Sequence, residues 1–295
     1  MMPHQLNWQE ICQMIPKRKA DAQKGDFGRL LCITGSRNMP GACLLSTQAA
    51  LRGGAGLVTV ATAPENPMRL AAAAPEAMWL PLETDEAGFL RSSDQNRKTL
   101  EKQLSRANAV LLGCGLGVTE ETRRLVHWVL EQAVCPVVLD ADGLNCAVSC
   151  IELSRRTGKD WILTPHPGEM ARLTGHSIPQ IQENRVETAT QFAAAYPVTL
   201  ALKGAGTLVA QGSRLAQNPT GNPGMSRGGS GDVLAGLIAA FAAQGIPSWE
   251  AACAGVYLHG LAGDAAAAAL SQQAMLPRDL LVYLPQVLVK LEQER

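Results

Sequence analysis

The sequence lacks the marks of several protein classes. Its 295 residues carry 26 Lys and Arg against 26 Asp and Glu, a formal net charge of +0. This balance argues against a dedicated surface for nucleic acid or for an anionic membrane, although a local basic patch is compatible with it. No apolar run reaches the roughly 18 residues of a membrane span. The amino terminus has no basic segment followed by an apolar one, so we expect no signal peptide and a cytoplasmic protein.

Two further absences concern cysteines and linkers. The eight cysteines include no C-x-x-C pair, so their spacing is not that of a metal site or a disulfide framework. Cys32, Cys114 and Cys135 lie in or beside apolar runs, as small core residues do. There is no Ser- or Pro-rich linker and no internal repeat. We therefore predict a single domain over residues 1–295, with a helical extension at 1–23.

What the sequence does have is an alternation of short apolar runs and longer helical patterns. The runs lack the polar alternation of half-exposed strands, as expected when helices cover both faces of a sheet. After about residue 230 only helical patterns follow, and Pro285 is expected to kink the last of them. The order predicts an α/β fold with a mostly parallel sheet. The predicted strands are 29–34, 57–62, 109–113, 136–140, 161–164 and 198–203.

Four successive predicted strands end in distinctive residues. They run into "CGLG", "ADGLN", "PHPGEM" and "GAGT", which supply Gly, Asp, His and Lys at the strand ends. In open parallel sheets, ligands bind at the carboxyl ends of the strands. Because these ends meet at one edge, we expect a site there.

The stretch "GGSGD" before "VLAGLIAAFAAQG" is the strongest single motif. Glycines let backbone N–H groups approach an anion closely, and a helix N-terminus adds partial positive charge. Asp232 alone would fit the first turn of any helix, but that interpretation leaves Gly228, Gly229 and Gly231 unexplained. No G-x-x-x-x-G-K-[ST] sequence occurs, so this is not a Walker A loop. A carboxylate beside bound phosphate suits a general base that takes a proton from an attacking hydroxyl.

The motif "GCGLG" at 113–117 is weaker, because Val118 stands where a dinucleotide-binding fingerprint needs its last glycine. In "LDADGLN", Asp140 and Asp142 stand two residues apart, and one of them is a candidate cap for the next helix. In "TPHPGEM", two prolines fix the backbone around His166, which favours a ligand contact. Glu169 either caps the next helix or helps to hold a metal through water, and the sequence leaves both open.

Lys203 ends a predicted strand and is followed by a glycine turn. It either contacts nucleotide phosphates or simply precedes a hairpin. The remaining histidines carry no site prediction: His127 and His259 fit helices, and His4 and His176 fit the terminus and a loop.

As a set, these motifs resemble the ADP-dependent NAD(P)H-hydrate dehydratases of the ribokinase-like superfamily. The resemblance rests on "KGDFGRLLCITGS", "PGACLLSTQAALRGGAGLVTVAT", "LLGCGLG", "LDADGLN", "LTPHPGEM", "LKGAGT" and "GNPGMSRGGSGDVLAG". It extends from about Lys24 to the C-terminal helices, in the family's order. With only about two dozen residues before the first motif, we expect a dehydratase without the epimerase domain that some relatives carry.

The resemblance implies a three-layer α/β/α sandwich and dehydration of the S epimer of hydrated NADH or NADPH. ADP would be the phosphoryl donor, giving AMP and phosphate, with Mg²⁺ as cofactor, and relatives are often homo-oligomers. Metal ligands are not indicated. The implied catalytic base is Asp232. The implied substrate contacts are Ala42, Gly115, Gly117, His166 and Asp232, and the nucleotide contacts are Lys203, Gly204, Ala205, Gly206, Thr207, Gly228, Gly229 and Gly231.

The sequence differs from the family pattern at two places, and two other functions compete with the one that the resemblance implies. Gln23 stands where family members often have histidine, and "GMSRGG" replaces the common "GMATGG", so that Arg227 adds a cation beside the glycine loop. One rival is an ATP-dependent kinase of a small hydroxymethyl or hydroxyethyl vitamin precursor, which would use the same loop and aspartate. The other is a dinucleotide-binding oxidoreductase, which the missing glycine of "GCGLG" disfavours.

Overall fold

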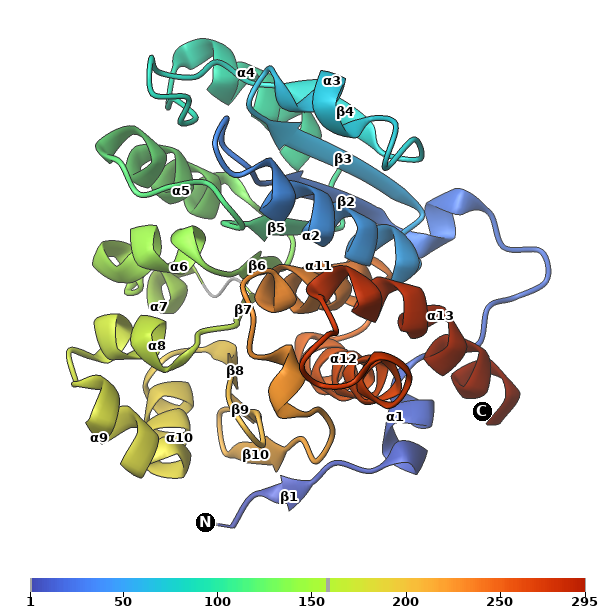
Figure 1. Cartoon of the computed structure of the whole chain (residues 1–295). Helices are drawn as coiled ribbons and strands as arrows, with labels where there is room; N and C mark the ends of the chain where they lie inside the picture. The colour runs from blue at the N-terminus through green and yellow to red at the C-terminus, as the bar shows by residue number, and fades with distance from the viewer. Residues whose placement is uncertain (1, 158–159, 295) are drawn as a thin grey trace.

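Over the residues that the structure describes, the protein is built on one sheet of ten strands. The structure, a computed structural model, describes residues 2–157 and 160–294. The strand order is β1-β10-β9-β8-β7-β6-β5-β2-β3-β4 (Figure 1). From β8 to β4 all neighbours are parallel, whereas β9 is antiparallel to β8 and β10. The strands are β1 (His4–Gln5), β2 (Arg29–Ile33), β3 (Leu57–Thr62), β4 (Met78–Pro81), β5 (Ala109–Leu112), β6 (Val137–Leu139), β7 (Trp161–Leu163), β8 (Val198–Leu202), β9 (Leu208–Gln211) and β10 (Arg214–Gln217).

Helices cover both faces of this sheet. The α-helices are α1 (Trp8–Met14), α2 (Pro40–Arg52), α3 (Asn66–Leu70), α4 (Asp94–Leu104), α5 (Glu120–Gln132), α6 (Asp142–Ala147), α7 (Leu153–Thr157), α8 (Pro167–Thr174), α9 (Ile178–Glu183), α10 (Arg185–Ala195), α11 (Ser230–Ala243), α12 (Ser248–Leu270) and α13 (Pro277–Glu294). The described ranges also contain the short 3₁₀ helices η1 (Lys24–Phe27), η2 (Val148–Cys150) and η3 (Pro223–Met225).

Strand β2 shows how one strand serves two cores. Successive side chains of a strand point to opposite faces. Leu30 and Cys32 join the core formed with α2, α11, α12 and α13, whereas Leu31 and Ile33 join the core formed with α5, α6, α8 and α10. Figure 1 shows the first group of helices in front of the sheet. The predicted three-layer α/β/α sandwich with a mostly parallel sheet is confirmed.

All six predicted strands are present, and the structure adds four short strands at the two ends of the sheet. Within residues 1–23 it has both the helix α1 and the strand β1, which pairs with β10. Helix α13 continues through Pro285, so the proline does not end the helix. The site depends on none of these four added strands except β9, which forms a hairpin with β8.

Helix α11 lies in the middle of the first helical layer. Twelve of its fourteen residues are buried, and it packs between the sheet and its neighbours α2 and α12. A Cβ atom added to Gly236 would lie 2.2 Å from the Ser46 carbonyl oxygen of α2. The two helices therefore cross in close contact, which fixes the N-terminus of α11 against the sheet.

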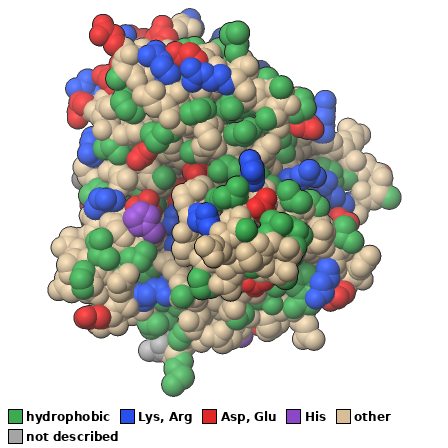
Figure 2. Space-filling view, viewed as in Figure 1, with side chains coloured by type: hydrophobic (Ala, Val, Ile, Leu, Met, Phe, Trp, Pro, Cys, Tyr) green, Lys and Arg blue, Asp and Glu red, His purple; other side chains and the backbone are tan. Residues whose placement is uncertain are grey.

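None of the helices in the described ranges combines the length and apolar character needed to span a bilayer. On the face drawn in Figure 2, basic and acidic side chains are interspersed. That distribution agrees with the equal counts of the two charges.

Candidate active site

The carboxyl ends of β5, β6, β7 and β8 carry a connected set of polar side chains. These strands are neighbours in the sheet. Asp140, Thr164 and Lys203 each directly follow their strand, and Cys114 follows β5 after one glycine. The Thr164 hydroxyl and the Lys203 ammonium both donate to Asp140 Oδ1, each at 2.7 Å. The strand ends thus converge, as the sequence predicts.

Asp140 and Lys203 form a buried ion pair. The side chain of Asp140 is 2% exposed and that of Lys203 is 18% exposed. Lys203 Nζ also lies 3.8 Å from Glu169 Oε2. Burial lowers the pKa of Lys203, but the carboxylates of Asp140 and Glu169 outweigh it, so that the pKa is raised. Lys203 therefore stays protonated and offers a fixed positive charge at this edge.

Asp232 stands in the first turn of α11, beside this pair. A Cβ atom on the preceding Gly231 would lie 3.2 Å from Lys203 Nζ, so the glycine leaves room for the ammonium group. Burial, and then the Asp140 carboxylate, raises the pKa of Asp232 to about 6. A carboxylate with a raised pKa near a phosphate-binding backbone suits a general base.

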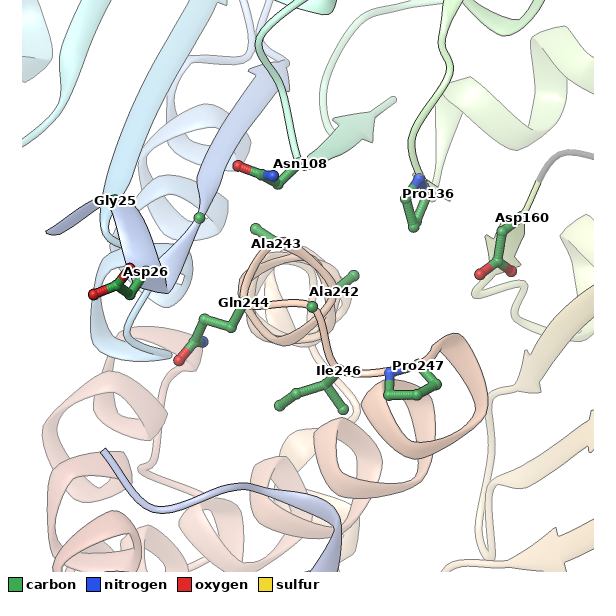
Figure 3. Close-up of a pocket in the computed structure, with 12 residues that line it drawn as sticks. Gly25, Asp26, Asn108, Pro136, Asp160, Ala242, Ala243, Gln244, Ile246 and Pro247 are labelled. Atoms are coloured by element: carbon green, nitrogen blue, oxygen red, sulfur yellow. The ribbon is translucent and has the colours of Figure 1, made fainter. Parts of the chain in front are cut away.

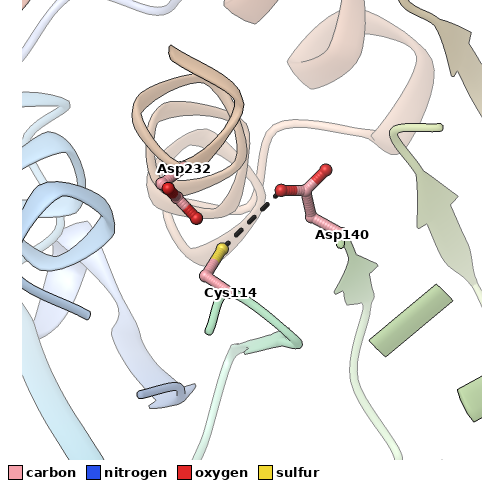
Figure 4. Close-up of side chains that lie close together, drawn as sticks. All are labelled: Cys114, Asp140 and Asp232. Atoms are coloured by element: carbon pink, nitrogen blue, oxygen red, sulfur yellow. Dashed lines mark hydrogen bonds between the residues drawn. The ribbon is translucent and has the colours of Figure 1, made fainter. Parts of the chain in front are cut away.

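Figure 4 shows the side chains of Cys114, Asp140 and Asp232 close to one another. One potential ligand atom from each lies within 4.8 Å of the others. The set does not fit Mg²⁺, because that ion takes oxygen ligands and not a thiol. The Lys203 ammonium also lies on one oxygen of Asp140. We therefore assign no protein-held metal to this cluster.

The turn after β6 is strained. Ala141 has φ +50° and ψ −119°, a backbone conformation that costs an alanine about 1–3 kcal/mol. The turn points neighbouring carboxylates in different directions. Asp140 faces Lys203, whereas Asp142 accepts a hydrogen bond from the Gly117 N–H at 2.8 Å. Neither aspartate caps α6 with its side chain, because Ala141 is the N-cap residue.

The residues predicted to contact substrate lie next to this turn or across the edge from it. A Cβ atom on Gly115 would lie 2.9 Å from the Ala42 Cβ of α2, so these two residues are in close contact. Gly117 is joined to Asp142. Their contact with a ligand stays a prediction.

His166 caps helix α8. Its Nδ1 accepts from the backbone N–H groups of Gly168 and Glu169 at 2.9 and 3.3 Å. Glu169 accepts from the His166 backbone N–H at 2.8 Å, which completes a capping box. Glu169 thus caps this helix, one of the two roles that the sequence left open. Burial, and then Lys203, lowers the pKa of His166, so the half-exposed ring is neutral at pH 7.

The predicted nucleotide contacts 204–207 form the turn between β8 and β9. The antiparallel pair shows that the hairpin interpretation of this segment is right. Gly204 and Gly206 have φ of +146° and +62°, which favour glycine. Arg185 of α10 donates to the carbonyls of Leu202, Ala205 and Gly206 and so fixes the turn. The turn directly follows Lys203, and its contact with a nucleotide stays a prediction.

The glycine loop is tied down on two sides. His259 Nε2 bonds to the Ser230 carbonyl at 3.0 Å, and burial lowers the pKa of this histidine to about 4, so its neutral ring acts as the donor. Arg227 donates to the backbone carbonyl of Gln273, in the segment between α12 and α13. The guanidinium therefore has a structural partner in this chain.

One pocket lies at the opposite edge of the sheet. It has a volume of about 280 Å³ and is lined by residues at the amino ends of the strands and by the end of α11 (Figure 3). Asp26 accepts from the Gln23 N–H, and Asp160 accepts from the Ser248 hydroxyl. Because these carboxylates already hold the backbone or a neighbour, and none of the predicted site residues lines the pocket, we place the chemistry at the carboxyl edge.

Known proteins similar to this chain point to one family. A family model described as NAD(P)H-hydrate dehydratase matches residues 30–286. The ADP-dependent (S)-NAD(P)H-hydrate dehydratase of Xanthomonas campestris is 36% identical over 269 residues, which cover 91% of this chain and 90% of that protein. The chain belongs to the NAD(P)H-hydrate dehydratase family. The family, predicted from the motifs, is confirmed, and its members are hydro-lyases.

Other relatives of this dehydratase-family chain are longer. The bifunctional NAD(P)H-hydrate repair enzyme of Moorella thermoacetica is 43% identical over 281 residues, and the match covers 95% of the chain but 53% of the relative. The chain thus spans about half the length of the bifunctional relatives that it matches.

Two solved structures share the fold of this dehydratase-family chain. The ADP/ATP-dependent NAD(P)H-hydrate dehydratase of Bacillus subtilis, co-crystallised with ATP/Mg²⁺, superposes with a TM-score of 0.81 at 31% identity, covering 98% of this chain and 99% of that one. A ribokinase-like superfamily protein of Enterococcus faecalis superposes with a TM-score of 0.84 at 30% identity, covering 98% and 96%.

Sequence reasoning missed one residue of this dehydratase-family site and left another ambiguous. Cys114 is fully buried, as a core residue would be, yet its sulfur lies 3.8 Å from Asp140 Oδ2. Its place at a strand end beside two glycines was the available signal. Asp140 was one of two equivalent aspartates, and only its pairing with Lys203, 63 residues away, distinguishes it.

Two glycines of the loop give a test of backbone access to phosphate in this dehydratase-family site. Gly229 has φ +107°, and a Cβ atom there would lie 2.8 Å from Leu45 Cδ1, so Gly229→Ala should cost about 1–2 kcal/mol of stability. Gly228 has nothing within 4 Å of an added Cβ and no positive φ. Gly228→Ala should therefore fold normally but raise the KM for ADP. Thermal unfolding and initial rates measure both effects, and an unchanged KM in the Gly228 variant would show that phosphate does not approach there.

Proposed function

We propose that this chain dehydrates the S epimer of hydrated NADH and NADPH, with ADP as phosphoryl donor and AMP and phosphate as products. The observation that carries the proposal is the position of Asp232, a carboxylate with a raised pKa, behind a glycine loop and beside the Lys203–Asp140 pair. Family membership favours it over a vitamin-precursor kinase or an oxidoreductase.

The chemistry requires activation of a poor leaving group. Asp232 takes the proton of the ring hydroxyl, whose oxygen attacks the β-phosphorus of ADP while the bond to the AMP oxygen breaks. The carbon–oxygen bond of the resulting phosphate ester then breaks as the ring nitrogen supplies electrons, and phosphate leaves with the former hydroxyl oxygen. Transfer of a proton from the neighbouring ring carbon to the departing phosphate restores the reduced nicotinamide. The chain's own part is thus to remove one proton and to stabilise charge on the moving phosphoryl group.

Two features of the site supply that stabilisation. The N-terminus of α11 and the backbone N–H groups of the glycine loop favour negative charge. Lys203, held protonated by Asp140 and Glu169, adds a full positive charge within reach of Gly231. Both are fixed before substrate arrives, so little reorganisation is needed in the transition state.

Mg²⁺ is expected to enter bound to the phosphates of ADP, as part of the co-substrate. The Bacillus subtilis relative was crystallised with ATP/Mg²⁺, which supports a nucleotide–magnesium complex at this fold. Our choice of ADP over ATP follows the name of the Xanthomonas campestris relative. The expected cytoplasmic location and homo-oligomeric state stay predictions.

The direct experiment incubates the protein with hydrated NADH, Mg²⁺ and either ADP or ATP. Recovery of the reduced-nicotinamide absorbance with ADP, accompanied by AMP, is the expected result. Recovery with ATP alone would overturn the choice of donor. If no recovery occurs with either nucleotide, or if Asp232→Asn recovers as fast as the unmodified chain, the proposed function is wrong.

The pH dependence gives a second test of the base. Because the pKa of Asp232 is raised to about 6 in the free chain, kcat/KM should fall about tenfold for each pH unit below that value. Burial also raises the pKa of Glu169 to about 6, so this residue needs a control. Glu169→Gln keeps an acceptor for the cap of α8. The fall of the rate at low pH, the acidic limb of the pH profile, should stay in place in this variant. A limb that disappears in the Gln variant would assign the titration to Glu169.

A further inference from the structure

Cys114 places a thiol between the two carboxylates of the site. The side chain is fully buried. Its sulfur lies 3.8 Å from Asp140 Oδ2 and, with the oxygen atoms of Asp140 and Asp232, forms a group whose members lie within 4.8 Å of one another (Figure 4). The backbone carbonyl of Cys114 accepts from the Gly35 N–H, a bond that any residue could make. The side chain is therefore the specific feature of this position.

The thiol keeps its proton. Burial, and then the charges of Asp232 and Asp140, raises the pKa of Cys114 well above its ordinary value. A protonated thiol has one hydrogen to donate; it bonds to Asp140 Oδ2, and an oxygen of Asp232 lies within 4.8 Å of the sulfur. Asp140 already receives the Thr164 hydroxyl and the Lys203 ammonium on Oδ1. The thiol also lies near Asp232, where it opposes the rise of the pKa of that carboxyl group.

We propose that Cys114 is a positioning residue for the catalytic base, which donates its S–H to Asp232 while that carboxylate is ionised and to Asp140 Oδ2 once Asp232 has taken the substrate proton. The thiol keeps its own proton throughout, so only the proton of the ring hydroxyl is transferred. The inference rests on the proposed function, because it needs Asp232 to act as the base. It explains why a buried position beside two carboxylates carries a side chain with a donor group.

The other charged groups around Asp232 come from different elements and stay unchanged when Cys114 is replaced. Asp140 follows β6, Lys203 follows β8 and Asp142 begins α6. Glu169 of α8 acts on the site through Lys203, 3.8 Å away. A change in the acidic limb of a Cys114 variant would therefore come from the lost donor.

The test compares the pH profile of kcat/KM for the unmodified chain, Cys114→Ala and Cys114→Ser. A hydrogen bond to a charged group is worth enough to move a pKa by about one unit, and the thiol is a weak donor. We expect the acidic limb of the alanine variant to move up by about 0.5–1 pH unit, which lowers the rate about two- to fivefold near pH 6. The serine variant, whose hydroxyl can donate, should restore the limb or move it below that of the unmodified chain.

Three measurements separate the outcomes. Thermal unfolding shows whether both small substitutions fold, and the KM for ADP should stay within about twofold in each. A rate that falls equally at all pH values in both variants, with the limb unmoved, would show that Cys114 only fills space and would overturn the inference. That result leaves the proposed function intact, whereas failure of the unmodified chain to dehydrate hydrated NADH would remove the proposed function itself.

Discussion

Replacing Asp232 with asparagine is expected to lower kcat about 10²–10⁴-fold and, at the same time, to stabilise the fold at pH 7. The loss follows from removal of the base. The gain follows because the ionised carboxylate is buried near Asp140, which raises its pKa from 3.8 to about 6. In the folded state the proton is therefore held more tightly than in the unfolded chain. The stability that this group contributes is present below pH 3.8 and is lost as the pH rises through about 6.

The shift of about two pKa units corresponds to about 3 kcal/mol of stability lost at pH 7. After the asparagine amide has been accommodated, we expect the variant to be about 1–2 kcal/mol more stable than the unmodified chain. Unfolding measured at pH 7 and pH 4 should show the gain at the higher pH only. Asp94, an exposed acid in the first turn of α4, is a matched control. Asp94→Asn should leave activity unchanged and cost about 0.3–1 kcal/mol through the helix dipole. If Asp232→Asn destabilises at both pH values, the carboxylate is a structural cap.

Lys203→Met should have the largest effect on stability, about 3–5 kcal/mol, because it leaves the Asp140 carboxylate buried without its counter-ion. Activity should also be lost, since the fixed positive charge beside Gly231 disappears. Chemical denaturation and the dehydration assay measure the two effects separately.

The double variant Lys203→Met with Asp140→Asn separates charge balance from catalysis. Removing both charges should recover most of the stability, because no unpaired ion remains in the interior. Activity should stay low if Lys203 stabilises charge on the phosphoryl group. A double variant that recovers activity together with stability would show that Lys203 serves only to neutralise Asp140.

Much of the fold could be predicted because the strands of the central sheet are continuous apolar runs. Strand β4 was missed: it is four residues long, lies at the edge of the sheet and ends in Pro81, so it carries little periodic signal. The carboxyl edge could be predicted as the site, since four strand ends carry unusual residues.

The pairings within the site could not be predicted from local patterns. Lys203 bonds to Asp140 and not to Asp142 because β8, β7 and β6 are neighbours and because the strained Ala141 turns the two aspartates apart. Likewise, the sequence predicted a cation beside the glycine loop at Arg227, and the partner of that cation, the Gln273 carbonyl, comes from a distant segment. Such contacts depend on which strands and loops become neighbours.

The close crossing of α11 and α2 at Gly236 has a consequence for how this site could evolve. The helix that presents Asp232 has almost no solvent-facing side chains on which substitutions would be harmless. An enlarged side chain at Gly236 would meet the Ser46 carbonyl, push the helix along or away from the sheet and displace the base relative to Lys203. Substitutions in the centre of this helix should therefore change catalytic rate and folding together, and variants selected for faster turnover should arise in the surrounding loops.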